Sequence, residues 1–278
     1  MTSVNYSKSL QTPVGKQPEK KYSWRIWRLL LLIPVWVYAV FLAVQLALML
    51  AVHGLAFLGV PFGVMNQVLL NTILSVVVYS LTVAVVIFVP WLIARRKTSL
   101  KLLGIDDWPT ILELLISPLV YVAYFLISAT LVAISVKFFS VDITQTQSTP
   151  FSQSILISHW QFILAFLVLV VLAPVAEELL FRGYLYGKLR NSFSVWLAVL
   201  VTSLTFGVAH LWGGDHLQWA VAVDTFALSL AMSVAREYTG ALWVPIMVHM
   251  IKNGIAFYML YLNPGLIDQI KAACLPFL

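Results

Sequence analysis

The strongest constraint on this chain is a series of apolar runs, each long enough to cross a lipid bilayer. Such a crossing takes about 20 mostly apolar residues in an α-helix. The runs are continuous, which is typical of membrane helices and not of alternating membrane strands. We predict seven spans, at 29–57, 67–94, 112–136, 157–190, 195–212, 217–235 and 240–261. The predicted fold is therefore an all-α, polytopic transmembrane helical bundle of about seven to eight spans.

The composition agrees with a membrane protein. Of the 278 residues, 61% are hydrophobic and 10% are charged, and the mean hydropathy is +0.94. Soluble domains carry about 25% charged residues, and a soluble fold of this size could not bury so much apolar surface. The single cysteine, Cys274, excludes a disulfide framework and a cysteine-rich metal site.

The basic residues predict how the chain is oriented. With seven spans and the N-terminus in the cytosol, every Lys and Arg except Lys137, Lys252 and Lys271 falls in or next to a cytosolic segment. Cytosolic loops of membrane proteins carry such an excess. We therefore assign the net charge of +6 to orientation in a cell membrane, and we expect no nucleic-acid partner.

Four regions are predicted along the chain. Residues 1–24 are polar and rich in Pro and Lys, which predicts a disordered cytosolic tail. Residues 25–150 form N-terminal transmembrane helices with few ionisable residues. Residues 151–262 form the functional core, and residues 263–278 form a C-terminal tail.

Ionisable side chains inside the spans are the candidate functional residues, because each costs about 2.5–3.5 kcal/mol at the bilayer centre. Glu178 and Arg182 are four residues apart on one helix face, which predicts an internal ion pair. His249 and Asn253 have the same spacing. The full set is Glu177, Glu178, Arg182, His210, Asp224, His249 and Lys252, with Asn253 as a polar companion.

Three of these side chains are predicted to meet. At 1.5 Å rise per residue, Glu177 lies roughly 20 Å from the cytosolic boundary, His210 roughly 24 Å and His249 roughly 18 Å. A carboxylate and two imidazoles thus reach about one depth on three helices. Pro174 removes a backbone donor near Glu177, which predicts a kink beside the carboxylate.

The motifs at these positions resemble those of the CPBP intramembrane proteases. Glu177-Glu178-Leu-Leu-Phe-Arg182 matches the family's EExxxR motif, Phe206-Gly-Val-Ala-His210 its FxxxH motif, and His249-Met-Ile-Lys-Asn253 its HxxxN motif. The motifs occur in family order across about residues 155–260. The family includes the type II CAAX prenyl endopeptidases and the bacteriocin-processing and immunity proteins.

The resemblance implies an intramembrane endopeptidase with a peptide or lipidated-protein substrate inside the lipid bilayer. Peptide hydrolysis needs an activated water and stabilisation of the developing oxyanion. We assign Glu177 as general base and His210 as a residue that holds the water. His249 and Asn253 are assigned as donors to the oxyanion. Glu178 and Arg182 complete the motif as a structural ion pair.

Alternatives remain at this stage. No cofactor is predicted, but Glu177, His210 and His249 also form a recognised set of zinc ligands. A catalytically silent scaffold or bacteriocin self-immunity protein on the same fold is the main functional alternative, and a proton-coupled carrier is another. Asp224 and Lys252 are predicted to pair, since both lie about 18–22 Å deep by the same measure.

Overall fold

The computed structural model describes residues 24–95, 97–143, 149–213, 216–266 and 269. The predicted N-terminal tail before Trp24 lies outside the described residues. So do Cys274, Lys271 and most of the predicted C-terminal tail.

The described chain is helical, and each predicted span corresponds to a helix. The helices are α1 (Trp24–Trp27), α2 (Leu29–Phe57), α3 (Gln67–Ala94), α4 (Leu100–Leu103), α5 (Ile111–Phe139), α6 (His159–Phe166), α7 (Ala173–Glu178), α8 (Tyr186–Arg190), α9 (Val195–Ala209), α10 (Trp219–Thr239) and α11 (Trp243–Phe257). Segments of π-helix at Leu167–Leu172 and Leu179–Leu185 join α6, α7 and α8 into one long helix, and Tyr258–Leu262 extends α11. Short 3₁₀ turns occur at Phe62–Val64 and Gln153–Ile155.

Local sequence signals set several helix ends. The Asn66 side chain accepts a hydrogen bond from the backbone N–H of Leu69 at 3.0 Å and begins α3. Thr110 and Glu113 form a reciprocal capping box at the start of α5. Gly240 ends α10 with φ +71°, a left-handed conformation that glycine adopts without strain.

Five helices are long and apolar enough to cross a membrane: 29–57, 67–93, 111–139, 159–190 and 219–239. In the most apolar 18-residue stretch of each of the first three helices, 11% of the residues are buried inside the protein. The corresponding share is 44% in 159–190 and 56% in 219–239. A water-soluble protein does not expose apolar faces this large, whereas lipid covers them without penalty. The protein is therefore an α-helical membrane protein with peripheral helices α2, α3 and α5.

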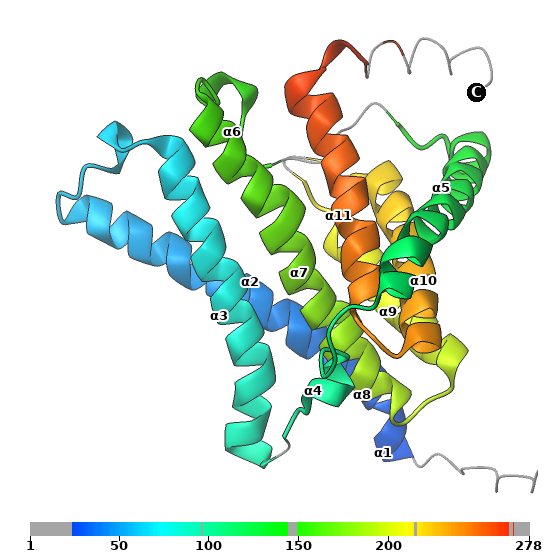
Figure 1. Ribbon diagram of the computed structural model, residues 1–278. Coiled ribbons are helices and arrows are strands. Elements are labelled where there is room, and N and C mark those ends of the chain that lie inside the picture. The colour runs from blue at the N-terminus through cyan, green and yellow to red at the C-terminus, as the bar shows by residue number, and fades with distance from the viewer. Residues whose placement is uncertain (1–23, 96, 144–148, 214–215, 267–268, 270–278) are drawn as a thin grey trace, which may run out of the picture.

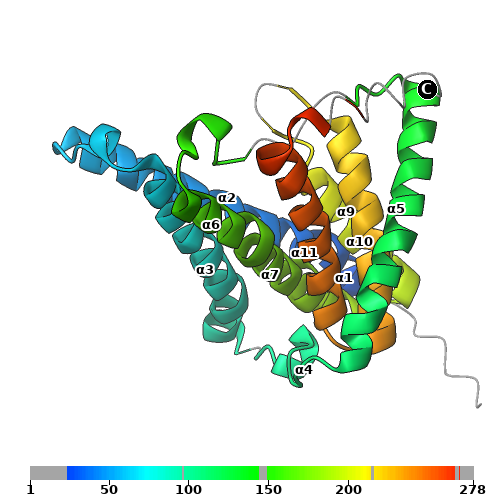
Figure 2. The same cartoon turned by 45° about the horizontal axis from the view of Figure 1, so that its top comes forward.

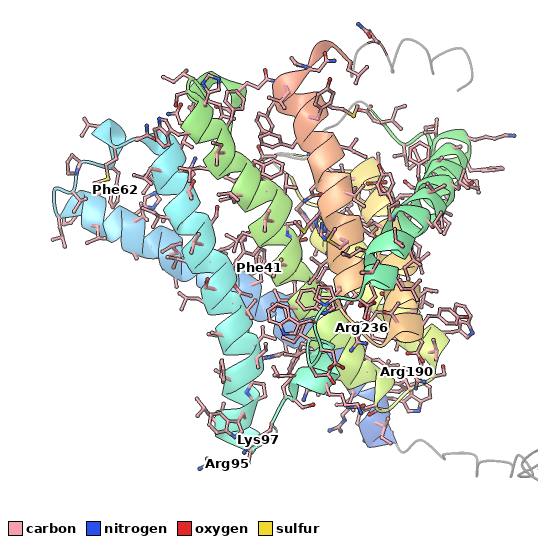
Figure 3. The ribbon with its side chains drawn as sticks, in the orientation of Figure 1. Phe41, Phe62, Arg95, Lys97, Arg190 and Arg236 are labelled. Carbon is pink, nitrogen blue, oxygen red and sulfur yellow. The ribbon has the colours of Figure 1, made fainter. Side chains whose placement is uncertain are left out.

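The arrangement places the helix 159–190 centrally. Figures 1 and 2 show the hairpin of α2 and α3 leaning away from α5, with α6–α8 and α11 between them. Arg95, Lys97, Arg190 and Arg236 lie toward one end of the bundle, and Phe62 lies at the opposite end (Figure 3). This grouping agrees with the predicted orientation, in which these cations are cytosolic.

Helix α9 is shorter than its predicted span of 195–212. It ends at Ala209, so His210 occupies the C-cap and is not inside the helix. Fifteen residues rise about 22 Å, less than the ~30 Å of a bilayer core. After the helix, Gln218 donates from its backbone N–H to the Leu211 carbonyl and from its side chain to the Gly213 carbonyl.

Candidate active site

The candidate site begins with an irregularity in the central helix. The nitrogen of Pro174 has no hydrogen, so it cannot donate to the carbonyl of Leu169 in π-helical register. The Leu169 carbonyl accepts instead from Asn253 Nδ2 at 2.9 Å. This bond ties α11 to the central helix about two turns before Glu177. A π-helical segment thus precedes Pro174, and a side chain of α11 bonds one of its carbonyls. The kink expected at Pro174 stays a prediction.

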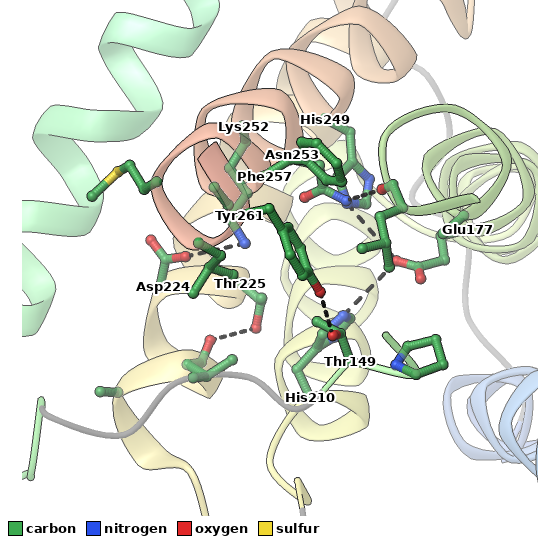
Figure 4. Close-up of a pocket in the computed structure, with 18 of the residues that line it drawn as sticks. Thr149, Glu177, His210, Asp224, Thr225, His249, Lys252, Asn253, Phe257 and Tyr261 are labelled. Atoms are coloured by element: carbon green, nitrogen blue, oxygen red, sulfur yellow. Dashed lines mark hydrogen bonds and ion pairs between the residues drawn. The ribbon is translucent and has the colours of Figure 1, made fainter. Parts of the chain in front are cut away.

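Glu177 and the two histidines converge as predicted. His210 Nε2 lies 3.8 Å from Glu177 Oε2, and His249 Nε2 lies 3.9 Å from the same oxygen. Figure 4 shows both imidazoles directed at this carboxylate. These separations are too long for direct hydrogen bonds. A water oxygen about 2.8 Å from both Glu177 Oε2 and one imidazole Nε2 would place these two atoms at an angle of roughly 85–90°. Each imidazole is therefore spaced to share a water with the carboxylate.

The opposite nitrogen of each imidazole is anchored. His210 Nδ1 lies 2.8 Å from the Phe206 carbonyl, and His249 Nδ1 lies 2.8 Å from Glu178 Oε1. A carbonyl and a carboxylate accept hydrogen bonds, so each Nδ1 donates. Both rings are thereby fixed with Nε2 facing Glu177.

Beneath the site lies a buried charge network. Arg182 Nη1 donates to Glu178 Oε1 at 2.8 Å, and both side chains are 0% exposed. The predicted Glu178–Arg182 ion pair is confirmed. Its extension to His249 was not predicted, because residues 71 positions apart give no local spacing signal. One carboxylate therefore compensates a buried cation and orients a site imidazole.

Phe206, the first residue of its motif, packs at the centre of this network. The Arg182 guanidinium carbon lies 4.3 Å from the centre of the Phe206 ring. The His210 and His249 rings lie 4.5 and 5.9 Å away, centre to centre. The ring is fully buried and joins the three motifs into one packed unit.

Tyr79 of α3 is a site residue that the sequence analysis missed. Its hydroxyl donates to Glu177 Oε1 at 3.2 Å, on the oxygen that the histidines do not face. A signal was present, since Ser75 and Thr82 flank Tyr79 at helical spacing and form a polar stripe in an apolar span. The N-terminal helices therefore contribute directly to the site.

The predicted pair of Asp224 and Lys252 is confirmed. Lys252 Nζ lies 3.5 Å from Asp224 Oδ2. Both residues line a cavity of about 510 Å³ that also exposes Tyr79, Glu177, His210, His249 and Asn253. The walls between these polar groups are apolar and include Leu169, Val221 and Phe257. A cavity of this size can hold a short peptide segment.

Comparison with known proteins agrees with these motifs. Residues 159–255 match the model of a family described as type II CAAX prenyl endopeptidase, Rce1-like. The matched segment is about a third of the chain. It contains every predicted site residue from Glu177 to Asn253, whereas Tyr79 lies outside it.

Three relatives are similar to parts of the chain. The membrane-embedded CAAX protease MroQ of Staphylococcus aureus (strain USA300) is 28% identical over 63% of this chain and 72% of its own length. The putative membrane peptidase YdiL of Bacillus subtilis (strain 168) is 28% identical over 34% and 37%. An uncharacterized 24.3 kDa protein of Escherichia coli is 37% identical over 32% and 40%. The chain therefore spans less than half of the length of the B. subtilis and E. coli proteins. No solved structure matches it.

The same three side chains can be tested against a zinc ion. Two imidazoles and a carboxylate are suitable donors. However, a zinc ion 2.0–2.1 Å from each atom would require N–Zn–O angles of roughly 130–155°, wider than tetrahedral. Within the described part of the chain, no three His, Cys, Asp or Glu side chains are arranged so that they could hold a metal ion together. In this geometry the three side chains do not fit a tetrahedral zinc ion.

Proposed function

We propose that this protein is an intramembrane endopeptidase that hydrolyses a peptide bond with a water activated by Glu177. One observation carries the proposal: two anchored imidazoles face one carboxylate oxygen at 3.8 and 3.9 Å. This spacing suits a shared water. The family match and the names of the staphylococcal and Bacillus relatives support a peptidase activity.

In the first step Glu177 takes a proton from the water while the water oxygen attacks the peptide carbonyl carbon. His210 donates from Nδ1 to the Phe206 carbonyl, which leaves the Nε2 lone pair to accept the second water hydrogen. The water is thereby oriented with its own lone pair toward the substrate. Glu177 then passes the captured proton to the leaving amine nitrogen.

His249 is assigned to the developing oxyanion. Glu177, Glu178 and Arg182 together carry one net negative charge. In this mechanism we assign a proton to both nitrogens of His249, so that Nδ1 donates to Glu178 and the Nε2–H faces Glu177. The Nε2–H then donates to the oxyanion. Asn253 binds Leu169 through one N–H, and its second N–H is the further donor we assign to this site.

The substrate is proposed to be a peptide or lipidated-protein segment that enters from the bilayer. The cavity lies among apolar helices, and its walls offer apolar side chains to such a segment. We place the protein in a cell membrane, with multiple crossings and a cytosolic N-terminus.

Purified protein in nanodiscs should cleave members of a panel of fluorogenic apolar peptides, prenylated and unprenylated. Cleavage should persist after treatment with 1,10-phenanthroline, because the proposed water activation needs no metal. Glu177→Ala and His249→Ala should abolish it. Cleavage lost with chelator and restored by zinc would instead make Glu177, His210 and His249 metal ligands.

The same assay addresses the alternatives. If a well-folded wild type cleaves no peptide and Glu177→Ala keeps full function in the host, the scaffold or self-immunity role replaces the endopeptidase. Peptide-independent proton flux into liposomes under a pH gradient would favour the carrier.

Replacing Tyr79 by phenylalanine should lower kcat about tenfold and leave KM unchanged. The change removes one hydrogen bond to a charged group, worth about 1.5 kcal/mol, and lets the Glu177 carboxylate rotate. Tyr258→Phe is the matched control, because that ring is 49% exposed and does not line the cavity. Equal kcat values in the two variants would remove Tyr79 from the site.

A further inference from the structure

A second polar cluster reaches the same cavity through Lys252 and Asp224, and the proposed hydrolysis does not use it. It consists of Lys252 of α11, Asp224 of α10, and Tyr124 and Ser128 of α5. Figure 4 shows Lys252 and Asp224 on the left and Glu177 on the right, with Tyr261 drawn between them. The cavity thus has Glu177 and the two histidines on one side and the Lys252–Asp224 pair on the other.

Asp224 is held in place independently of Lys252. Its Oδ1 accepts from the Tyr124 hydroxyl at 2.7 Å and from Ser128 Oγ at 2.5 Å. Its Oδ2 faces the Lys252 ammonium. Helix α5 therefore fixes a carboxylate beside the Lys252 side chain.

The Lys252 ammonium has donors to spare. Its 3.5 Å separation from Asp224 exceeds the 2.7–2.9 Å of a charge-assisted hydrogen bond. Among the described residues it makes no closer polar contact, and an ammonium has three N–H donors. Partly buried ion pairs add little stability compared with apolar residues. The arrangement suits an ammonium that binds an anionic ligand in the cavity.

We propose that Lys252 anchors a carboxylate of the peptide substrate, with Asp224 as its positioning residue. This inference rests on the proposed endopeptidase function. The carboxylate belongs either to the free C-terminus of the peptide or to an acidic side chain. Lys252 lies three residues beyond His249, a rise of about 4.5 Å. Lys252, His249 and Glu177 line one cavity, so a peptide segment anchored at Lys252 extends toward Glu177.

Binding to inactive protein tests the anchor without requiring turnover. Full-length Glu177→Gln protein in nanodiscs would be titrated with acetyl-trileucine as free acid and as C-terminal amide. A second pair, acetyl-Leu-Glu-Leu-amide and acetyl-Leu-Gln-Leu-amide, tests an acidic side chain. We expect one acidic member to bind at least about tenfold more tightly than its neutral partner.

Adding Lys252→Met should abolish that preference, and adding Lys252→Arg should retain it. Lys137→Met is the control, because this lysine does not line the cavity. Loss of the preference for the free acid identifies the C-terminus as the anchored group, and loss of the preference for Glu identifies a side chain. An acid-to-neutral ratio near one, unmeasurable binding, or a ratio unchanged by Lys252→Met overturns the proposal.

The two proposals fail separately. Binding that depends on Lys252, without any Glu177-dependent hydrolysis in the wild type, leaves an anion site and removes the endopeptidase. Hydrolysis that depends on Glu177, with no effect of Lys252→Met on the acid-to-neutral ratio, keeps the endopeptidase and removes the anion site.

Discussion

Glu177→Gln should reduce peptide hydrolysis by about 10²–10⁴-fold, the contribution expected of a general base. Glutamine keeps the shape of the side chain and can still accept from Tyr79, so the site should remain assembled. What is lost is the ability to take a proton from the water between His210 and His249. The loss should appear in kcat, measured with the best peptide of the panel.

Glu113→Gln is the matched control for this substitution. Glu113 is also a glutamate on an apolar helix, but it accepts from the Thr110 backbone N–H at 2.7 Å in a capping box, which glutamine can complete. Its activity should equal that of the wild type. If Glu177→Gln kept more than a tenth of wild-type kcat, the base would be a different group, and Asp224 would be the carboxylate to test next.

The parts of the site that could be predicted from the sequence are those with local spacing or a common depth. Glu178 and Arg182 share one helix face, and their ion pair followed from that spacing alone. The convergence of Glu177 with two histidines followed from helix rise, because apolar helices that cross a bilayer share one reference frame. In a membrane protein, the position of a residue along its helix therefore predicts its depth, and residues at equal depth on different helices can be matched.

The contacts that could not be predicted depend on which helices are neighbours. Tyr79 reaches Glu177 across 98 positions, and His249 reaches Glu178 across 71. The end of α9 at Ala209 also escaped prediction, since the apolar pattern continues through Leu211 and Trp212. Helix packing and the turn held by Gln218 decide these features, and neither leaves a periodic signal.

Arg182→Met should destabilise the protein by about 3–5 kcal/mol, which lowers the thermal midpoint on the order of 10 °C. The substitution keeps an apolar side chain over Phe206 but leaves Glu178 without its cation in a fully buried site. Fluorescence-monitored unfolding in detergent would measure the change. The double variant Glu178→Gln/Arg182→Met should recover part of the loss, because it removes the uncompensated charge.

Arg190→Met provides the comparison at an exposed pair. Arg190 contacts Glu237 at 3.0 Å, with side-chain exposures of 41% and 26%. Water and the Tyr186 hydroxyl, 2.5 Å from Glu237 Oε2, can still solvate that carboxylate after the arginine is lost. Its removal should therefore change stability by about 1 kcal/mol or less. Equal midpoints for Arg182→Met and Arg190→Met would mean that Glu178 is compensated by His249 alone, and that Arg182 is dispensable to the buried network.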